Sequence, residues 1–280
     1  MRLAEIALLW YARRVPPHRG KWWVVRQLLP LASVSPGGET VERRGGLLWS
    51  LDPSDYVCGD VFWCGEKDPW EIWHLQRLTP ASGPCVFLDV GANFGYYSLR
   101  LAHQAGCLFH AYAFEPNPPS FERLQRNISL NSSANVKAFR MGLSDRPGSL
   151  SIEAHPANSG AARLVERAGD IPVSTLDDFV ESHGLTRVDL IKIDVEGYEE
   201  RVLAGGRRTF GRFHPHLLLE INPPSLDAAG SAPAHLMSMV ESFGYRIQEI
   251  DRRRLRPLVH APQGEDYVNV LCSPVHPSRS

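Results

Sequence analysis

From residue 85 onward, short apolar runs alternate with segments whose apolar residues recur at helical spacing. Runs such as VDLIKID (188–194) and HLLLEIN (216–222) are rich in β-branched residues and leucine, as in parallel strands buried on both faces. Strands that alternate with helices predict a doubly wound parallel sheet with right-handed crossovers. The predicted strands are 85–90, 108–115, 135–141, 188–194 and 215–221, and the predicted helices are 95–105, 118–131, 174–183, 197–206 and 232–243.

Two later segments depart from this alternation. Residues 148–173 contain three glycines and two prolines, and we expect a loop-like insertion between the third and fourth strands. Residues 245–251 (YRIQEID) and 265–273 (EDYVNVLCS) are separated by a polar stretch without a helical pattern, so they should pair antiparallel. A parallel sheet that ends in an antiparallel hairpin is unusual for dehydrogenases.

The amino-terminal part has a different composition, because all seven tryptophans lie in the first 73 residues. This shift predicts a Trp-rich cap segment over 1–80, followed by a second domain over 81–280. We expect helices near 2–13, 20–30 and 66–78 and a short hairpin around 40–62. The tryptophans either shape an acceptor pocket or, in the simpler interpretation, anchor the cap to the core.

Composition narrows the function classes. A net charge of −1 over 280 residues gives no electrostatic case for nucleic acid or an anionic membrane as the main partner. Five scattered cysteines lack the spacing of a zinc site or a disulfide framework, which favours a reducing compartment. The apolar run Ile6–Trp10 is too short for a signal peptide or a membrane span. These features predict a soluble, cytoplasmic protein, and its oligomeric state cannot be read.

The stretch VFLDVGANFGYY (86–97), followed by YAFEPN (112–117), carries the most specific chemistry. A strand, a turn with Gly91 and Gly95, a helix and a second strand ending at Glu115 form the front half of a nucleotide-binding βαβ unit. Glu115 is placed to accept hydrogen bonds from both ribose hydroxyls, which predicts an adenosine-containing cofactor. Asn93 stands where the dinucleotide fingerprint has its middle glycine, and this argues against a pyrophosphate at the helix start. The plainer alternative is a tight turn without a ligand.

Several segments in this order resemble the FkbM-type S-adenosylmethionine-dependent methyltransferases. They are FLDVGANFGYYSLRLA, AFEPNPPSFERLQRNISLN, STLDDFV, VDLIKIDVEGYEERVLAGG and HLLLEINP. The resemblance covers about 58–272 and is sharpest from 86 to 222. It implies an α/β fold of the Rossmann-like class I methyltransferase type, with a seven-stranded, mostly parallel sheet whose seventh strand is antiparallel. The predicted carboxyl-terminal hairpin agrees with that fold.

Carried over position by position, the resemblance also implies a set of cofactor contacts for S-adenosylmethionine. They are Asp89, Gly91, Asn93 and Gly95 in the methionine-binding turn, Glu115 at the ribose, Pro116 and Asn117 beside the adenine, and Ser144 or Asp145 at the adenine amino group. For Asp145 a simpler role is open, since SDRPG (144–148) is a strong turn sequence in its own right.

The strand IKID is the candidate source of the catalytic residues. Alternation along a strand puts Lys192 and Asp194 on one face, with Glu196 just beyond the strand end, where ligands bind in open α/β sheets. A buried ammonium is costly without a partner, so Lys192 should pair with Asp194 or Asp89. Such a pair either has a functional role, in which it holds the site or serves as the proton acceptor, or is only a structural ion pair.

A second polar cluster ends the strand HLLLEIN. Asp194, Glu220 and Asn222 could converge on a hard cation such as magnesium, in a layout similar to some catechol-type O-methyltransferases. Positioning of the acceptor is the preferred interpretation, and no metal site is predicted.

These observations predict an S-adenosylmethionine-dependent methyltransferase that acts on a hydroxyl of a small molecule, sugar or natural product. The preference for oxygen over nitrogen rests on the resemblance alone. The alternatives are a nicotinamide-dependent Rossmann oxidoreductase and a non-catalytic Rossmann-like binding module.

Overall fold

The computed structural model describes residues 3–15, 21–28, 38–80, 82–106, 108–155, 158–264 and 267–275. Among these residues, no helix has both the length and the apolar character needed to cross a membrane.

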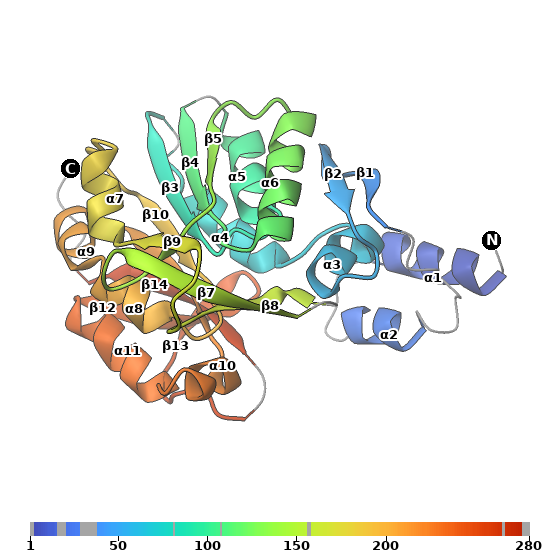
Figure 1. Ribbon diagram of the computed structural model, residues 1–280. Coiled ribbons are helices and arrows are strands. Elements are labelled where there is room, and N and C mark those ends of the chain that lie inside the picture. Colours follow the sequence, from blue (N-terminus) through green and yellow to red (C-terminus); the bar gives the residue numbers. More distant parts are fainter. Residues whose placement is uncertain are drawn as a thin grey trace.

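An eight-stranded sheet forms the centre of the molecule, with the strand order β13-β12-β14-β11-β10-β3-β4-β5 (Figure 1). The run from β11 to β5 is parallel, and the strands from β14 to β13 pair antiparallel, as the hairpin prediction required. The eighth strand, β13, exceeds the expected seven because the chain turns at Arg252–Arg253 and pairs back onto β12. The strands are β3 Cys85–Val90, β4 Phe109–Phe114, β5 Val136–Phe139, β10 Leu190–Ile193, β11 His216–Ile221, β12 Tyr245–Asp251, β13 Arg254–Pro257 and β14 Val268–Pro274.

Helices cover both faces of this sheet, because successive strand residues point to opposite sides. Phe87 packs in the cluster formed with α4 and α5, whereas Leu88 packs in the cluster formed with α7, α8, α9 and α11. The helices are α4 Pro69–Leu78, α5 Tyr96–Ala105, α6 Pro118–Leu130, α7 Leu176–Ser182, α8 Glu199–Ala204, α9 Arg207–Phe213, α10 Pro223–Ala228 and α11 Pro233–Ser242. The short helices α9 and α10 were not among the predicted elements.

The prediction of a loop-like insertion over 148–173 was wrong. The chain there forms β7 (Gly148–His155), β8 (Asn158–Val165) and β9 (Ile171–Ser174), which join β6 (Gly142–Leu143) in a four-stranded sheet. Apolar Leu150 and Ile152 alternate with polar residues and pack near buried Leu164. Gly148 begins β7, Gly169 lies in the connection between β8 and β9, and the sheet accommodates Gly160 and Pro172 within β8 and β9.

The amino-terminal part contains α1 (Leu3–Arg14), α2 (Lys21–Leu28), a hairpin of β1 (Thr40–Arg44) and β2 (Leu47–Leu51), and α3 (Tyr56–Cys64). The hairpin is shorter than the predicted 40–62, because the chain enters α3 instead. Asp55 caps that helix by accepting hydrogen bonds from the backbone N–H groups of Val57 and Cys58. An acidic residue before an apolar run is a helix start signal.

Two tryptophans of this part are anchors. Trp49 is fully buried and packs edge-on against Phe94, with 5.8 Å between ring centroids. Trp63 is buried beside Ala12 and Val25. One hydrophobic cluster therefore includes residues from both sides of the proposed boundary near residue 80, and the division into 1–80 and 81–280 stays a prediction.

Candidate functional site

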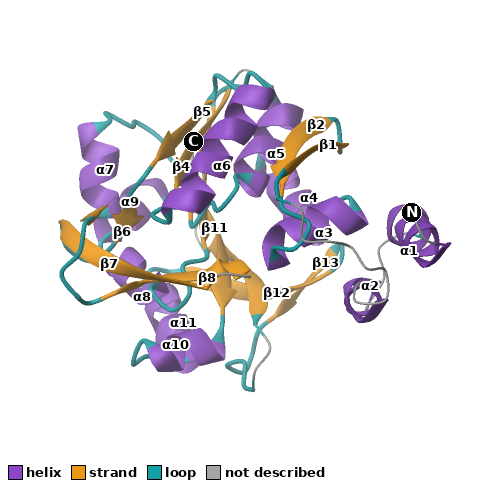
Figure 2. Cartoon of the chain, turned by 45° about the vertical axis from the view of Figure 1, so that its right-hand side comes forward, coloured by secondary structure: helices purple, strands orange, loops and turns teal. Residues whose placement is uncertain are grey.

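A cavity of about 380 Å³ lies at the carboxyl ends of β3, β4, β10 and β11. This volume is within the range of small-molecule sites. Other parts of the chain also line it, among them α3 with the loop that follows it, residues 141–143, the start of β8, and Tyr267 before β14. The β7–β8 hairpin reaches across the molecule so that its end lies beside α3 (Figures 1 and 2).

The turn after β3 lets the backbone approach its neighbours closely. Gly91 has a φ of 81°, and a Cβ there would lie 1.8 Å from the backbone oxygen of Asp194. The N–H groups of Gly91 and Ala92 both donate to the carbonyl of Phe114, which ties the turn to β4. Asn93 follows with a φ of 49°, a conformation that asparagine tolerates better than most residues. Only glycine fits at position 91, because the φ is positive and because a Cβ would collide with the backbone of Asp194.

Glu115 lines the cavity at the end of β4. Its Oε2 accepts from the N–H of Asn93 at 2.7 Å, and its Oε1 accepts from the N–H of Asn117 at 2.8 Å. Burial raises the pKa of Glu115 to about 7, against the opposing effect of these two N–H groups. Each carboxylate oxygen keeps a lone pair, so this side chain can still accept hydrogen bonds from a ligand.

Lys192 is buried and joins two parts of the site. Its Nζ lies 3.1 Å from Asp194 Oδ2 and 3.9 Å from Asp89 Oδ1, so it pairs with both of the carboxylates that the prediction offered as alternatives. It also donates to the carbonyl of Gly91 at 3.1 Å. Burial alone would lower the pKa of Lys192, but Asp194 and Asp89 raise it above its usual range. The ammonium thus stays charged and fixes the turn against β10.

Three carboxylates meet at the other end of the cavity. Oxygens of Asp194, Glu196 and Glu220 lie within 4.8 Å of one another. Glu196 Oε2 accepts from Ser225 Oγ at 2.7 Å and from the amide of Asn222 at 3.2 Å. Burial and the charge of Asp194 raise the pKa of Glu196 to about 7 and hold that of Glu220 well above its usual value. In contrast, Lys192 and Lys67 outweigh burial at Asp194, so the pKa of Asp194 is lowered.

Several predicted contact residues lie behind the cavity wall. Asp89 is fully buried and accepts from the N–H and Oγ of Ser98, and Gly95 lies against Leu124. Asn117 is the residue before α6. None of these three lines the cavity, although Gly91, Asn93, Glu115 and Pro116 do.

Ser144 and Asp145 also lie outside the cavity lining. Ser144 Oγ donates to Asp145, whose other carboxylate oxygen is 3.5 Å from Arg201. The cavity wall at this point is formed by residues 141–143. The adenine contact expected of Ser144 or Asp145 therefore stays a prediction.

Sequence reasoning missed the wall that faces the three carboxylates. Tyr56, Asp60 and Lys67 come from α3 and the loop after it, and Tyr267 comes from the far end of the chain. The Nζ of Lys67 pairs with Asp68. No local pattern marks these residues, because only the fold brings them to the cavity.

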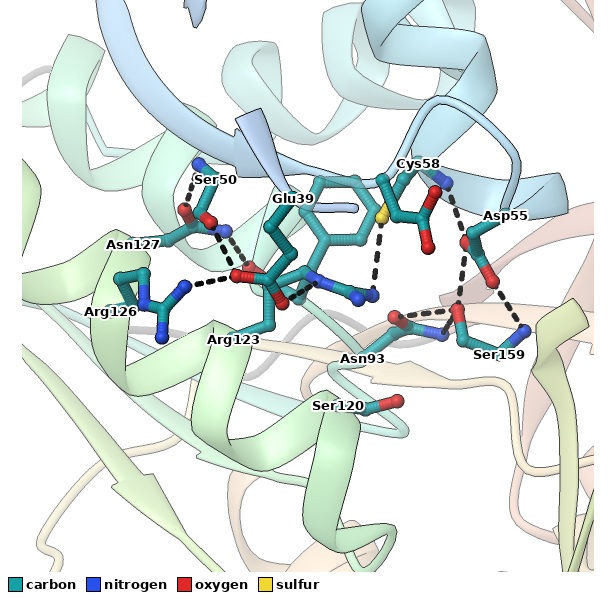
Figure 3. Close-up of polar contacts among 12 residues, drawn as sticks. Glu39, Ser50, Asp55, Cys58, Asn93, Ser120, Arg123, Arg126, Asn127 and Ser159 are labelled. Atoms are coloured by element: carbon teal, nitrogen blue, oxygen red, sulfur yellow. Dashed lines mark hydrogen bonds and ion pairs between the residues drawn. The ribbon is translucent and has the colours of Figure 1, made fainter. Parts of the chain in front are cut away.

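A polar network holds the β7–β8 hairpin over the turn. Ser159 donates through its N–H to Asp55 Oδ2 at 2.7 Å and through Oγ to Asp55 Oδ1 at 3.0 Å. The same Oγ lies 3.2 Å from the side-chain nitrogen of Asn93. Figure 3 shows Asp55, Ser159 and Asn93 pointing toward one another. The hairpin, the cap and the turn therefore close one end of the cavity together.

Residues 89–247 match the family model of the methyltransferase FkbM domain. The chain is 35% identical over 148 residues to the hexuronic acid methyltransferase AglP of Haloferax volcanii, a match that covers 48% of this chain and 60% of that protein. It is 30% identical over 222 residues to the methyltransferase sdnD of Sordaria araneosa, a match that covers 66% of this chain and 82% of that protein. It is 33% identical over 159 residues to the 2-O-methyltransferase NoeI of Sinorhizobium fredii, a match that covers 49% of this chain and 63% of that protein.

Among solved structures, the METTL16 methyltransferase domain superposes with a TM-score of 0.51 at 13% identity, covering 82% of this chain and 74% of that one. This likeness concerns the fold, and it agrees with the predicted class of Rossmann-like methyltransferases.

Proposed function

This chain belongs to the FkbM methyltransferase family, and from that premise we propose that it transfers a methyl group from S-adenosylmethionine to a hydroxyl of a sugar or other small natural product. The observation that carries the proposal is one cavity with two chemically different ends. Glu115 and the Gly91 turn form one end, and the carboxylates of Asp194, Glu196 and Glu220 form the other.

The residues at the first end fit the cofactor. Glu115 offers a buried carboxylate to two adjacent hydroxyls, as a ribose presents them. Pro116 and residues 141–143 supply apolar wall for a base beside it, and the Gly91 turn leaves room for the methionine part. When bound, S-adenosylmethionine supplies an electrophilic methyl group, which leaves its sulfonium sulfur as the acceptor oxygen bonds to it.

The second end suits an acceptor rich in hydroxyl groups. Carboxylates accept hydrogen bonds from hydroxyls, and the rings of Tyr56 and Tyr267 offer flat apolar surface nearby. Asp194 is the proposed catalytic residue that orients the acceptor hydroxyl, with Glu196 beside it, and the hydroxyl proton passes to this carboxylate cluster. Lys192 is a positioning residue, because its ammonium is committed to Gly91, Asp194 and Asp89.

The printed names of the relatives support this substrate class, since one is a hexuronic acid methyltransferase and another a 2-O-methyltransferase. The matches span 60% and 63% of those two proteins, so the activity and the acceptor of this chain are proposals. The cytoplasmic location and the lack of a nucleic-acid partner stay predictions.

Isothermal titration with S-adenosylhomocysteine, with NAD as the control ligand, tests the cofactor assignment. We expect micromolar binding of the first ligand only, lost in Glu115→Ala. Preferential binding of NAD would revive the oxidoreductase alternative. S-adenosylhomocysteine binding without methyl transfer to any member of a sugar and phenol panel would favour the non-catalytic module. An Asp194→Asn variant should lose turnover more than cofactor affinity, and full activity would remove Asp194 from the mechanism.

A further inference from the structure

The three carboxylates at the acceptor end form an unusual concentration of charge. Asp194 follows β10, Glu196 lies two residues beyond it, and Glu220 is on the neighbouring strand β11. One oxygen from each lies within 4.8 Å of the other two, although like charges repel at that distance. Something must offset this repulsion, either protons or a cation.

Glu220 shows that the cluster is incomplete. Its side chain is only 8% exposed, it lines the cavity, and its Oε2 has no hydrogen-bond partner. A buried carboxylate oxygen without a partner is expensive, because it has lost its water without gaining a donor. The orphaned oxygen therefore indicates a missing ligand that accepts an electron pair.

The neighbouring lysines do not fill this role. Lys192 is paired with Asp194 and Asp89, and Lys67 is paired with Asp68. In the described part of the chain, no lysine or arginine nitrogen is within 4.0 Å of Glu196 or Glu220. Glu196 and Glu220 thus have no lysine or arginine partner among the described residues, and when both are ionised their combined charge matches that of a divalent cation.

We propose that Asp194, Glu196 and Glu220 bind a hard divalent cation of the magnesium, manganese or calcium type. All three supply oxygen ligands, which such ions prefer. Two oxygens that bind one Ca²⁺ ion at about 2.3–2.6 Å lie up to about 5 Å apart, so the observed spacing accommodates an ion of that size. The shorter Mg²⁺ distance of about 2.0–2.1 Å would draw the carboxylate oxygens to within about 4.2 Å of one another. The sequence prediction of no metal site is revised by this proposal.

The catalytic meaning of the cation rests on the proposed function. An acceptor hydroxyl bound to it would lose its proton more readily, because a cation lowers the pKa of a coordinated oxygen acid. The proton would pass to a carboxylate oxygen of the cluster that does not face the cation. The hydroxyl oxygen would then bond to the methyl carbon as the carbon–sulfur bond breaks.

The test is a titration of the metal-stripped, cofactor-free protein with MnCl₂, in which electron paramagnetic resonance measures free Mn²⁺. We expect one ion per chain in the wild type, competition by MgCl₂ or CaCl₂, and about tenfold or more weaker binding in Glu220→Gln and Glu196→Gln. Glu71→Gln is the matched control, since Glu71 is a half-buried carboxyl whose pKa is also raised to about 7 but which lies outside the cluster. Its Mn²⁺ binding should equal that of the wild type.

Absence of stoichiometric Mn²⁺ binding, or equal binding by Glu220→Gln and Glu196→Gln, would overturn the site and leave protons as the shared counter-charge. S-adenosylhomocysteine affinity, measured on the same preparations, separates the two proposals. A protein that binds S-adenosylhomocysteine but not Mn²⁺ retains the proposed function and loses the metal site. A protein that binds Mn²⁺ but not S-adenosylhomocysteine retains the metal site and loses the proposed function.

Discussion

Gly91→Ala offers a direct measure of how tightly the turn packs against β10. A Cβ at this position would lie 1.8 Å from the backbone oxygen of Asp194 and 2.9 Å from its carbonyl carbon. Ordinary Cβ contacts begin at 3.4 Å, so the end of β10 would have to withdraw by about 1.6 Å. Both contacting atoms belong to the backbone, and a flexible side chain cannot absorb the shift.

Two costs add at this position. The φ of 81° costs a non-glycine residue about 1–2 kcal/mol, and overpacking against a fixed neighbour costs about 1–3 kcal/mol more. Gly244 is the matched control, because its φ is 83° and a Cβ there would meet nothing within 4 Å. Gly244→Ala should therefore lose only about 1–2 kcal/mol of unfolding free energy, which is the cost of the positive φ.

Urea unfolding of both variants separates the two costs. We expect Gly91→Ala to be about 1–3 kcal/mol less stable than Gly244→Ala, which lowers its Tm by several degrees more. We also expect Gly91→Ala alone to lose S-adenosylhomocysteine affinity, because the shift displaces Asp194 and the cavity wall. Equal stability losses in the two variants would refute the close approach of Gly91 to β10.

Four further predictions follow from the site and its supports. Since the pKa of Glu115 is about 7 and hydroxyl donors favour its ionised form, S-adenosylhomocysteine affinity should fall about tenfold from about pH 8 to about pH 6; a flat calorimetric profile would contradict this. The folded pKa of Glu115 lies above its ordinary 4.5, so its contribution to stability is present at low pH and is lost as pH rises through 7. The cofactor-free protein should lose about 2.5 kcal/mol of unfolding free energy for this group between about pH 5 and about pH 8, measured by urea unfolding. Burial also raises the pKa of Glu199 to about 7, so this group adds to the loss of stability with rising pH. A stability that rises with pH over this window would contradict the raised pKa of both carboxyl groups. Ser159→Ala breaks the hydroxyl contacts to Asp55 and Asn93 and should weaken S-adenosylhomocysteine binding by about fivefold, whereas Ser151→Ala on the same hairpin, which loses only a bond to Ala168, should bind normally. Trp49→Ala should cost about 3–5 kcal/mol of unfolding free energy because Trp49 is fully buried, whereas Trp10→Ala, at a side chain that is 64% exposed, should cost less than about 0.5 kcal/mol.

The parallel strands were predictable because their signal is local. VDLIKID and HLLLEIN are buried on both faces, and their apolar composition alone marks them as central strands. The antiparallel end was predictable for a related reason, since no helix pattern separates 245–251 from 265–273. The signal failed for β7–β9, whose half-buried strands contain few apolar residues and are divided by glycine.

The candidate site divides in the same way. Gly91, Glu115 and Asp194 each follow directly from a strand, so one βαβ pattern places them at a common edge. Lys67 and Tyr267 are 200 residues apart and meet only after the sheet has closed, which no spacing rule can anticipate. The orphaned oxygen of Glu220 is also invisible in the sequence, because it depends on which donors the fold brings near.

The buried lysine in β10 connects these two halves. A lysine inside an otherwise apolar strand contradicts the local pattern, and such contradictions in a sequence tend to mark functional positions. Its ammonium contacts the carbonyl of Gly91 at the proposed cofactor end of the cavity and Asp194 at the proposed acceptor end. Because one charged group fixes both, the distance between the turn and the carboxylates is set by the rigid sheet and not by a loop. The proposed methyl transfer between two ligands requires a fixed distance of this kind, and within that proposal Lys192 is a positioning residue.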